Sequence, residues 1–165
     1  RHHETGETIP AKLFKKMLAA KNYRSASDIM RQLSFGKLDL ELHMHHATAE
    51  GADLDVLSRK ILDGYLMALK TEAPTMARRF GHLFSSPTGY AAGYYVYMWA
   101  EVLDCDGFEA FVEAGSAFHA PTAERLRRCI LSSGNSQEPG AAFRAFRGRD
   151  PVVQPMLKSR GLLPA

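Results

Sequence analysis

Residues 82–99 read HLFSSPTGYAAGYYVYMW and place four tyrosines within eight positions, behind a loop rich in glycine. Tyr90, Tyr94 and Tyr97 are spaced i, i+4 and i+7, which predicts that a helix over this stretch carries all three hydroxyls on one face. We expect this helix to run to about Val112 and His82 to lie in the loop that leads into it. A row of phenols on one face is a set of aligned hydrogen-bond donors.

This row of tyrosines has two interpretations. Tyrosines at helical spacing are common in protein cores, so packing alone is one of them. Gly89 and Gly93 favour the other, because glycine lets a second backbone approach closely. A core also seldom needs three phenols together, since Phe or Leu fills the same space without a hydroxyl to satisfy. The pattern therefore leaves both a packed core and a binding site open.

Helical periodicity continues outward from this stretch over almost the whole chain. We expect helices from Pro10 to about Lys21, from the caps at 22–27 through Leu42, from Asp53 through Leu69, from Pro121 to Gly134, over 141–146, and after Pro151. We find no convincing alternation of period two and no internal repeat. The fold class is therefore all-α, with about six or seven helices.

Composition predicts one domain over residues 1–165, because 165 residues with 45% hydrophobic content can bury one sizeable core. The net charge of +3 comes from 21 basic and 18 acidic residues scattered along the chain, which gives no arm for nucleic acid. Six arginines between Arg125 and Arg149 make the last third locally basic. We interpret them as a solvated helical face with ion pairs, and a site for a polyanion is the alternative.

The chain has no apolar run of membrane-spanning length. Its two cysteines, Cys105 and Cys129, are too few for a disulfide framework and indicate free thiols in a reducing compartment. We therefore expect a cytoplasmic protein that binds neither nucleic acid nor membranes. A mitochondrial or other organellar location is the alternative if a transit peptide precedes this sequence.

Seven histidines raise the question of a metal site. His43 and His46 have an i, i+3 spacing that can share a zinc ion, but histidines near a helix C-terminus also suit the helix dipole, and we favour that interpretation. His2 and His3 would bind metal only adventitiously. A helical zinc-peptidase motif needs two histidines four residues apart, and no pair here has that separation. We assign no metal ligand to this chain.

Nucleophilic catalysis has no support either, because neither cysteine lies in a recognisable nucleophile motif and no Gly-x-Ser-x-Gly run is present. The chain thus offers hydrogen-bond donors without a group that drives a reaction. That combination indicates one wall of an active site.

Several runs of the sequence resemble the C-terminal part of the M3 family of zinc oligopeptidases. The runs are HETGE at 3–7, KMLAAKNY at 16–23, RQL at 31–33, FGHL at 80–83, GYAAGYY at 89–95, WAEV at 99–102 and FRAFRGR at 143–149. They extend from one end of the chain to the other, and the tyrosine segment is the most specific of them.

The resemblance implies a fold made of two almost entirely helical lobes around a deep channel, with the HExxH helix and a later glutamate ligand upstream of the matched region. Zinc would then be a cofactor of the parent enzyme and not of this chain alone. His82 looks like the histidine of the family's Gly-His-Leu loop, and Tyr90, Tyr94 and Tyr97 look like its three active-site tyrosines. One departure from the family concerns residues 84–89. Family members have a short Gly-Gly step between the histidine and the first tyrosine, whereas this connection is longer and contains a proline. In the family this loop is thought to hinge as substrate binds, so the departure concerns its mobility and the position of His82.

These residues predict specific roles in peptide hydrolysis. A phenol donates a hydrogen bond while staying neutral near pH 7, so it suits the oxyanion of a tetrahedral intermediate. We assign oxyanion stabilisation to Tyr97 and Tyr90, and contact with the substrate to Tyr94, His82 and Gly89.

The function predicted from the sequence is the C-terminal, substrate-side part of a zinc metallopeptidase that hydrolyses short peptides. Its partners would be those peptides and the metal-bearing N-terminal part of the same protein, without which the chain is expected to be inactive. Two alternatives remain. One is a non-catalytic helical module that binds a peptide or protein, and the other is a stand-alone metalloprotein that uses His43 and His46.

Overall fold

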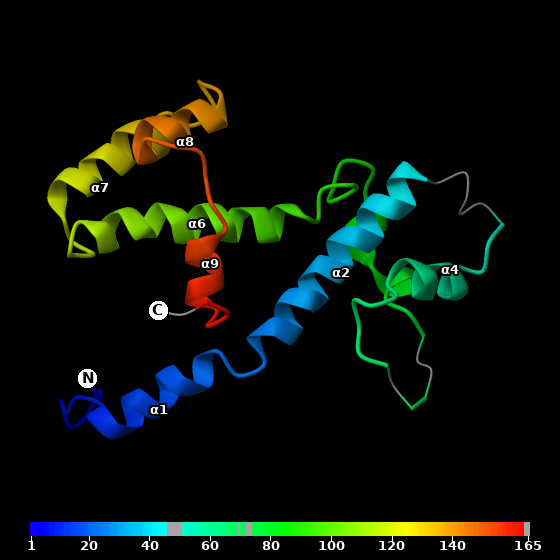
Figure 1. Cartoon of the computed structure of the whole chain (residues 1–165), viewed down its shortest axis with the longest axis horizontal. Helices are drawn as coiled ribbons and strands as arrows, with labels where there is room; N and C mark the ends of the chain where they lie inside the picture. Colours follow the sequence, from blue (N-terminus) through cyan, green and yellow to red (C-terminus); the bar gives the residue numbers. More distant parts are fainter. Residues whose placement is uncertain (46–50, 69, 72–73, 164–165) are drawn as a thin grey trace.

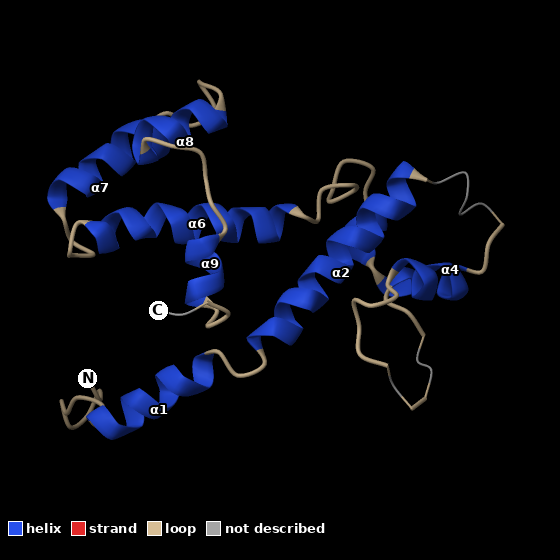
Figure 2. Ribbon diagram, viewed as in Figure 1, coloured by secondary structure: helices blue, strands red, loops and turns tan. Residues whose placement is uncertain are grey.

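A computed structural model describes residues 1–45, 51–68, 70–71 and 74–163. These residues form helices, turns and loops, with no strand among them (Figure 2). The helices are α1 (Ala11–Lys21), α2 (Ser25–Met44), α4 (Leu54–Ile61), α5 (Gly81–Phe84), α6 (Val96–Glu113), α7 (Ala120–Leu126), α8 (Pro139–Arg147) and α9 (Gln154–Ser159). The prediction of an all-α fold is confirmed.

The two long helices α2 and α6 organise the molecule (Figure 1). Helix α6 contacts α9 along its side, and the π-helical turn Arg127–Leu131 that continues α7 contacts α8. Helix α2 contacts α6, and it also contacts α4, which packs against the short 3-10 turn Ala77–Arg79. Helix α1 extends from α2 toward the N-terminus, away from α4 (Figure 1).

The buried apolar side chains form four clusters distributed along α2 and α6. The clusters are Leu38, Leu42, Leu62 and Ala77; Ile29, Val102 and Met156; Phe35, Phe80 and Leu83; and Ala110, Phe111 and Phe146. Because α2 contributes to three of them, it links the region around α4 to the region around α6. The cluster of Phe35, Phe80 and Leu83 lies beneath the tyrosine segment, where Tyr94 packs against it.

Local signals explain where α8 begins and ends. The Glu138 carboxylate accepts hydrogen bonds from the backbone N–H groups of Gly140 (2.8 Å) and Ala141 (2.5 Å), which caps the first turn. Gly148 follows the helix with φ of 78°, a left-handed conformation that glycine adopts without a steric penalty. The helix expected over 141–146 is therefore confirmed and slightly longer.

Helix α4 is shorter than the sequence predicted. Asp53 caps it as expected, since its carboxylate accepts from the backbone N–H groups of Asp55 (2.8 Å) and Val56 (3.1 Å). The helix nevertheless ends at Ile61, because Gly64 at φ 77° turns the chain away. Tyr65 therefore lies in the turn after the helix, and Leu69 is outside the described residues.

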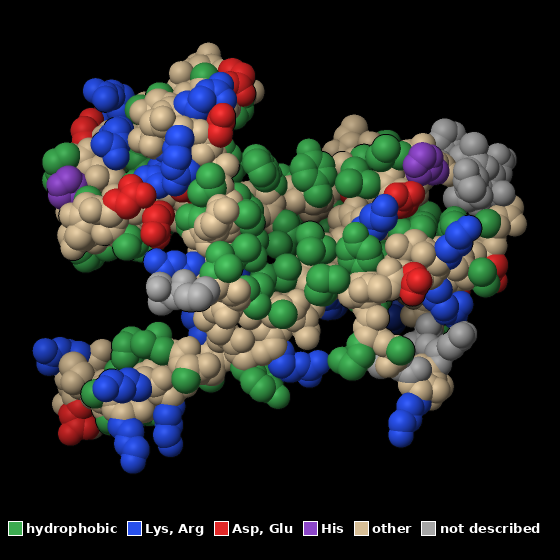
Figure 3. All heavy atoms as spheres, viewed as in Figure 1, with side chains coloured by type: hydrophobic (Ala, Val, Ile, Leu, Met, Phe, Trp, Pro, Cys, Tyr) green, Lys and Arg blue, Asp and Glu red, His purple; other side chains and the backbone are tan. Residues whose placement is uncertain are grey.

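Not every apolar position of the N-terminal helices is covered. The expected helix α1 forms, but none of its residues is buried, and Leu13, Phe14, Met17 and Leu18 are 48 to 54% exposed. On α2, Met30 and Leu33 are 36 and 41% exposed, because the neighbouring elements cover only one side of the helix. Figure 3 shows hydrophobic side chains across the middle of one face, with charged side chains toward its margins.

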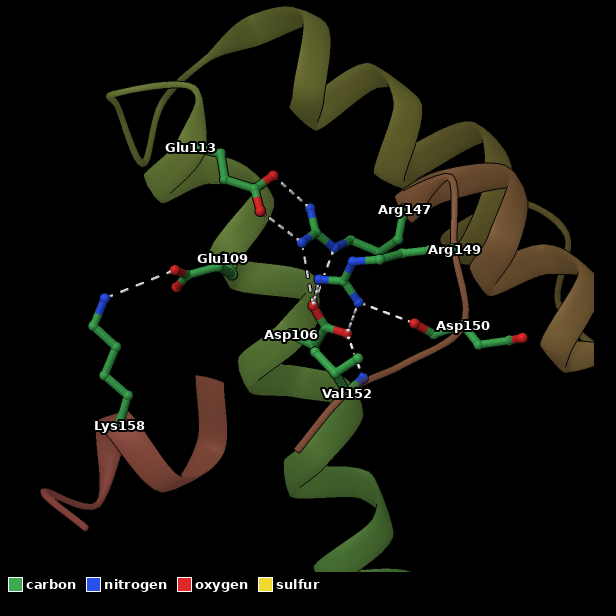
Figure 4. A network of polar contacts seen from close by, with 8 residues as sticks. All are labelled: Asp106, Glu109, Glu113, Arg147, Arg149, Asp150, Val152 and Lys158. Atoms are coloured by element: carbon green, nitrogen blue, oxygen red, sulfur yellow. Dashed lines mark hydrogen bonds and ion pairs between the residues drawn. The ribbon is translucent and has the colours of Figure 1, made fainter. Parts of the chain in front are cut away.

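A buried carboxylate attaches the C-terminal segment to α6 (Figure 4). Asp106 is fully buried and accepts hydrogen bonds from Arg149 Nη1 (2.7 Å) and Nη2 (2.6 Å) and from the Val152 backbone N–H (2.9 Å). Arg147, whose side chain is 4% exposed, lies between Asp106 and the carboxylate of Glu113. The ion pairs expected for the C-terminal arginines are thus present, although Arg147 is buried and not on a solvated face.

Among the described residues, no helix combines the length and apolar character needed to cross a bilayer. Cys105 and Cys129 are free thiols, as predicted. Burial raises the pKa of the Cys105 thiol, so the thiolate needed for nucleophilic attack is disfavoured.

Candidate active site

The tyrosine segment is not the single helix that its spacing predicted. Helix α6 begins only at Val96, so Tyr97 is helical, whereas Tyr90 and Tyr94 lie in the turns that precede it. Ala92 adopts φ of 53°, a left-handed conformation incompatible with continuing a right-handed helix through the segment. The prediction of a helical row of hydroxyls is therefore wrong.

The turns nevertheless bring the predicted side chains together. The ring centroids of Tyr94 and Tyr97 are 5.0 Å apart, those of Tyr90 and Tyr97 are 5.5 Å apart, and those of Tyr90 and Tyr94 are 6.3 Å apart. The His82 ring lies 6.0 Å from Tyr90 and 6.5 Å from Tyr94. We call His82, Tyr90, Tyr94 and Tyr97 the aromatic site.

Helix α5 and two buried rings support the aromatic site from below. His82 lies in α5 and not in a loop, so its backbone is fixed between Phe80 and Phe84. The Phe80 ring is buried and meets Tyr94 edge-on at 4.9 Å, and Phe35 of α2 meets Tyr94 at 5.7 Å. Such edge-to-face contacts hold one side of the Tyr94 ring in a defined orientation.

The other side of the aromatic site is open. Tyr90 and Tyr97 are 39 and 45% exposed, His82 is exposed, and Tyr94 is half-buried. A set of tyrosines that served only as core would be sealed by its neighbours, whereas these hydroxyl-bearing rings line a surface. Gly89 lies at the turn before Tyr90, where the nearest contact to an added Cβ would include the His82 carbonyl oxygen at 3.6 Å.

The local electrostatics keep the Tyr97 phenol protonated. Its pKa is raised above the ordinary value, chiefly by its hydrogen bond with Tyr90 and further by partial desolvation. A neutral phenol retains its O–H donor throughout the neutral pH range. The Tyr97 hydroxyl is therefore a neutral hydrogen-bond donor, as an unperturbed phenol would also be.

Asp39 of α2 holds the tyrosine turn from beneath, and sequence analysis did not identify it. Its side chain is fully buried, and its two carboxylate oxygens accept hydrogen bonds from the backbone N–H groups of Ala92 and Tyr94, each at 2.8 Å. The available signal was a carboxylate between Leu38 and Leu42, on a stretch of helix that the apolar pattern marks as buried.

Gly36 of α2 lies one turn before Asp39, beside the same segment. A Cβ at this position would lie 3.4 Å from the Tyr95 Cα and 3.6 Å from its backbone nitrogen. The backbone of the tyrosine segment therefore passes directly over α2.

The aromatic site does not itself provide a zinc-ligand set. Zinc takes histidine, cysteine and carboxylate ligands, whereas this site offers one imidazole and three phenols, of which Tyr97 is held neutral. In the described part of the chain, His2, His3 and Glu4 are a group with ligand atoms within 4.8 Å of one another, and all three are exposed. His2 Nδ1 already accepts backbone N–H groups from Glu4 and Thr5, each at 3.3 Å.

The alternative zinc site predicted from the sequence consists of His43 and His46. His46 lies outside the described residues. His43 directs Nδ1 toward Asp39, 2.8 Å from Oδ1 of the carboxylate and 2.9 Å from its backbone carbonyl oxygen. The position of His43 is thus explained by its contacts within α2.

The protein-family model described as "Peptidase family M3" matches residues 1–162 of this chain. The chain therefore belongs to peptidase family M3, and the resemblance seen in the sequence is confirmed. It is 43% identical over 168 residues to oligopeptidase A of Escherichia coli, covering 98% of this chain and 23% of that protein.

Two further relatives are also similar to this chain. The organellar oligopeptidase A (chloroplastic/mitochondrial) of Arabidopsis thaliana is 39% identical over 174 residues, covering 100% of this chain and 21% of that protein. The dipeptidyl carboxypeptidase of Escherichia coli is 34% identical over 163 residues, covering 98% of this chain and 24% of that protein. The chain thus spans less than a quarter of the length of these relatives.

Proposed function

We propose that this chain forms the substrate-side wall of the active site in a zinc-dependent metallopeptidase that hydrolyses short peptides. The observation that carries the proposal is the aromatic site, in which three tyrosine rings and His82 lie together on an open surface. Membership of family M3 and the names of the relatives, oligopeptidase A and dipeptidyl carboxypeptidase, support a peptidase.

In this proposal the zinc ion supplies the hydrolytic chemistry and is held by residues outside these 165. The aromatic site contributes hydrogen-bond donors. Tyr97 and Tyr90 donate to the scissile carbonyl oxygen as negative charge develops on it, because a donor already aimed at that oxygen needs no reorganisation during the reaction. The raised pKa of Tyr97 supports this role, since a phenolate has no proton to donate.

Tyr94, His82 and Gly89 contact the peptide on either side of that carbonyl. Tyr94 suits this role because its ring is half-buried and fixed by Phe80 and Phe35, so its hydroxyl is held in one place. Gly89 lies next to the His82 carbonyl oxygen and carries no side chain of its own, so its backbone is accessible to a peptide. The partners of the chain are then a short peptide and the metal-bearing part of the same protein.

We propose a cytoplasmic location, with an organelle as the alternative. Similar proteins of Arabidopsis thaliana carry both kinds of name, one "Probable cytosolic oligopeptidase A" and one "Organellar oligopeptidase A, chloroplastic/mitochondrial".

The decisive test is Tyr97→Phe in the intact peptidase that contains this chain. The change deletes one oxygen and keeps the ring, so packing against Tyr90 and Tyr94 is retained. Loss of one oxyanion donor is expected to lower kcat by roughly 100- to 1,000-fold with little change in KM. Tyr95→Phe is the matched control, because Tyr95 belongs to the same segment but is 52% exposed and outside the aromatic site.

The competing interpretation makes a different prediction. If the tyrosines only pack, or if the chain is a non-catalytic helical module, removal of the Tyr97 hydroxyl should leave the turnover rate unchanged. The stability cost would then be about 1 kcal/mol or less, the ordinary value of one hydrogen bond. Equal and small effects on the rate at Tyr95 and Tyr97 would refute the catalytic assignment.

A further inference from the structure

One buried carboxylate, together with a backbone hydrogen bond from the Gly93 N–H to the Tyr90 carbonyl oxygen (2.8 Å), holds the turn that carries the tyrosines. Asp39 Oδ1 accepts the Ala92 backbone N–H and Asp39 Oδ2 accepts the Tyr94 backbone N–H, both at 2.8 Å. Hydrogen bonds to an ionised carboxylate are shorter and stronger than those between neutral groups. Each oxygen thus holds one residue of the turn, and the two bonds together fix both the position and the tilt of the backbone between Tyr90 and Tyr94.

The backbone conformation at Ala92 makes this support necessary. Its φ of 53° is left-handed, and a non-glycine residue adopts that conformation only where its surroundings hold it there. The Ala92 N–H is one of the two groups that Asp39 binds. Loss of the carboxylate would remove one of the contacts that hold Ala92 in this conformation, and with it a constraint on where the Tyr90 and Tyr94 rings lie.

Asp39 is itself fixed by His43, one turn later on α2. His43 Nδ1 lies 2.8 Å from Asp39 Oδ1, and the His43 ring stacks on Phe84 with centroids 5.6 Å apart. Phe84 is the last residue of α5, the helix that carries His82. The helical turn of α2 that carries Asp39 and His43 therefore contacts both the tyrosine turn and α5, the helix of His82.

We propose that Asp39 is a positioning residue for the peptidase reaction, acting through the backbone of Ala92 and Tyr94 on the geometry of the aromatic site. Asp39 is fully buried and does not reach a substrate. The inference rests on the proposed function, because the geometry it controls matters to catalysis only if the tyrosines donate to the substrate.

The test variant is Asp39→Asn in the intact peptidase. An asparagine has the same shape but offers one oxygen and one NH₂ group, so one of the two backbone N–H groups would face a donor. Misplacement of the donors should lower kcat by about 10- to 100-fold while KM changes little. Hydrogen exchange at the amides of Ala92 and Tyr94 should become at least about tenfold faster as the turn opens locally.

Asp106→Asn is the matched control. Asp106 is also a fully buried carboxylate that accepts a backbone N–H group, that of Val152 (2.9 Å), but it holds the C-terminal segment and not the tyrosine turn. The same chemical change there should leave kcat and the exchange of the tyrosine turn unchanged. A loss of rate caused by general destabilisation would appear in both variants in proportion to their loss of melting temperature.

A double variant tests whether Asp39 acts through the tyrosines. In the Tyr90→Phe background the oxyanion donor beside the turn that Asp39 holds is absent, so Asp39→Asn should cost less than about threefold in kcat. Full additivity of the two losses would overturn the positioning role, as would an Asp39→Asn enzyme with normal kcat. Unchanged exchange at both amides would overturn it as well, whatever the rate.

The proposed function fails if the Tyr97→Phe enzyme turns over at the normal rate. The hydrogen-exchange measurement on Asp39→Asn reports on the turn whether or not the proposed function is correct. If Asp39→Asn does not fold, His43→Ala provides the same test, because the His43 side chain is 26% exposed and tolerates truncation better. Faster exchange of the Ala92 and Tyr94 amides is expected in this variant, with a loss of kcat in the same direction. Normal values of both would overturn the proposal.

Discussion

Replacement of Asp106 by asparagine should destabilise the fold more than any exposed charge substitution on α6. Asp106 Oδ1 accepts from Arg149 Nη2 (2.6 Å) and Arg147 Nε (3.2 Å), and Oδ2 accepts from Arg149 Nη1 (2.7 Å) and the Val152 N–H (2.9 Å). Asparagine keeps the volume but replaces one of these acceptors by an NH₂ donor. At least two of the four donors then lose their acceptor, and two arginines lose their buried counter-charge.

The magnitude follows from the burial of each partner. Removal of one member of a buried ion pair costs about 3–5 kcal/mol, because the remaining charge stays desolvated. Arg147 is 4% exposed and pays this penalty, although Glu113 still pairs with it at 2.9 Å. Arg149 is 39% exposed and can turn toward water, which reduces its share. We therefore expect the free energy of unfolding to fall by about 3 kcal/mol, the lower end of that range.

Urea unfolding of the 165-residue chain, followed by circular dichroism, measures this loss. The control is Asp150→Asn, which makes the same change to a carboxylate whose side chain is 73% exposed and whose partner Arg144 is 51% exposed. Exposed pairs contribute about 0.2–1 kcal/mol, so the two variants should differ by at least about 2 kcal/mol. A loss of less than about 1 kcal/mol for Asp106→Asn would refute the argument that this carboxylate compensates a buried charge.

Two further predictions concern the loss of stability at low pH and the contact between Gly36 of α2 and Tyr95. Burial opposes ionisation of Asp106, but the hydrogen bonds from Arg149 and Val152 and the charges of both arginines together outweigh it. The hydrogen bond from Arg147 lowers the pKa of Glu113 in the same way, so folding lowers both carboxyl pKa values. A carboxyl group whose pKa is lower in the folded than in the unfolded chain stabilises the fold at any pH above its unfolded-state pKa. The urea midpoint should therefore fall as the pH drops below about 4, and it should fall less steeply in Asp106→Asn. Gly36→Ala should raise the free energy of unfolding by about 0.5–1 kcal/mol, because alanine favours the helix and its Cβ would make an ordinary 3.4 Å contact with the Tyr95 Cα. The value of kcat should not change. Thermal unfolding and a peptidase assay measure the two quantities. Lower stability in Gly36→Ala would show that the approach is tighter than this distance indicates.

The sequence determined the elements whose signals are local. Helical periodicity and the Asp53 cap depend on residues within about one turn of each other, and the helices and the cap at Asp53 are present in the structure. The residues of the aromatic site could also be named from the sequence, because the runs that contain them resemble the family to which the chain belongs.

Tertiary structure decided how those aromatic residues meet. Periodicity placed Tyr90, Tyr94 and Tyr97 on one helix, whereas a left-handed Ala92 and a turn place them together. That turn is held by Asp39, which lies 53 residues from Ala92 in the sequence. Likewise Asp106 meets Arg149 across 43 residues. Local patterns carry no information about such pairs, because a buried carboxylate is stable only where the whole fold brings donors to it.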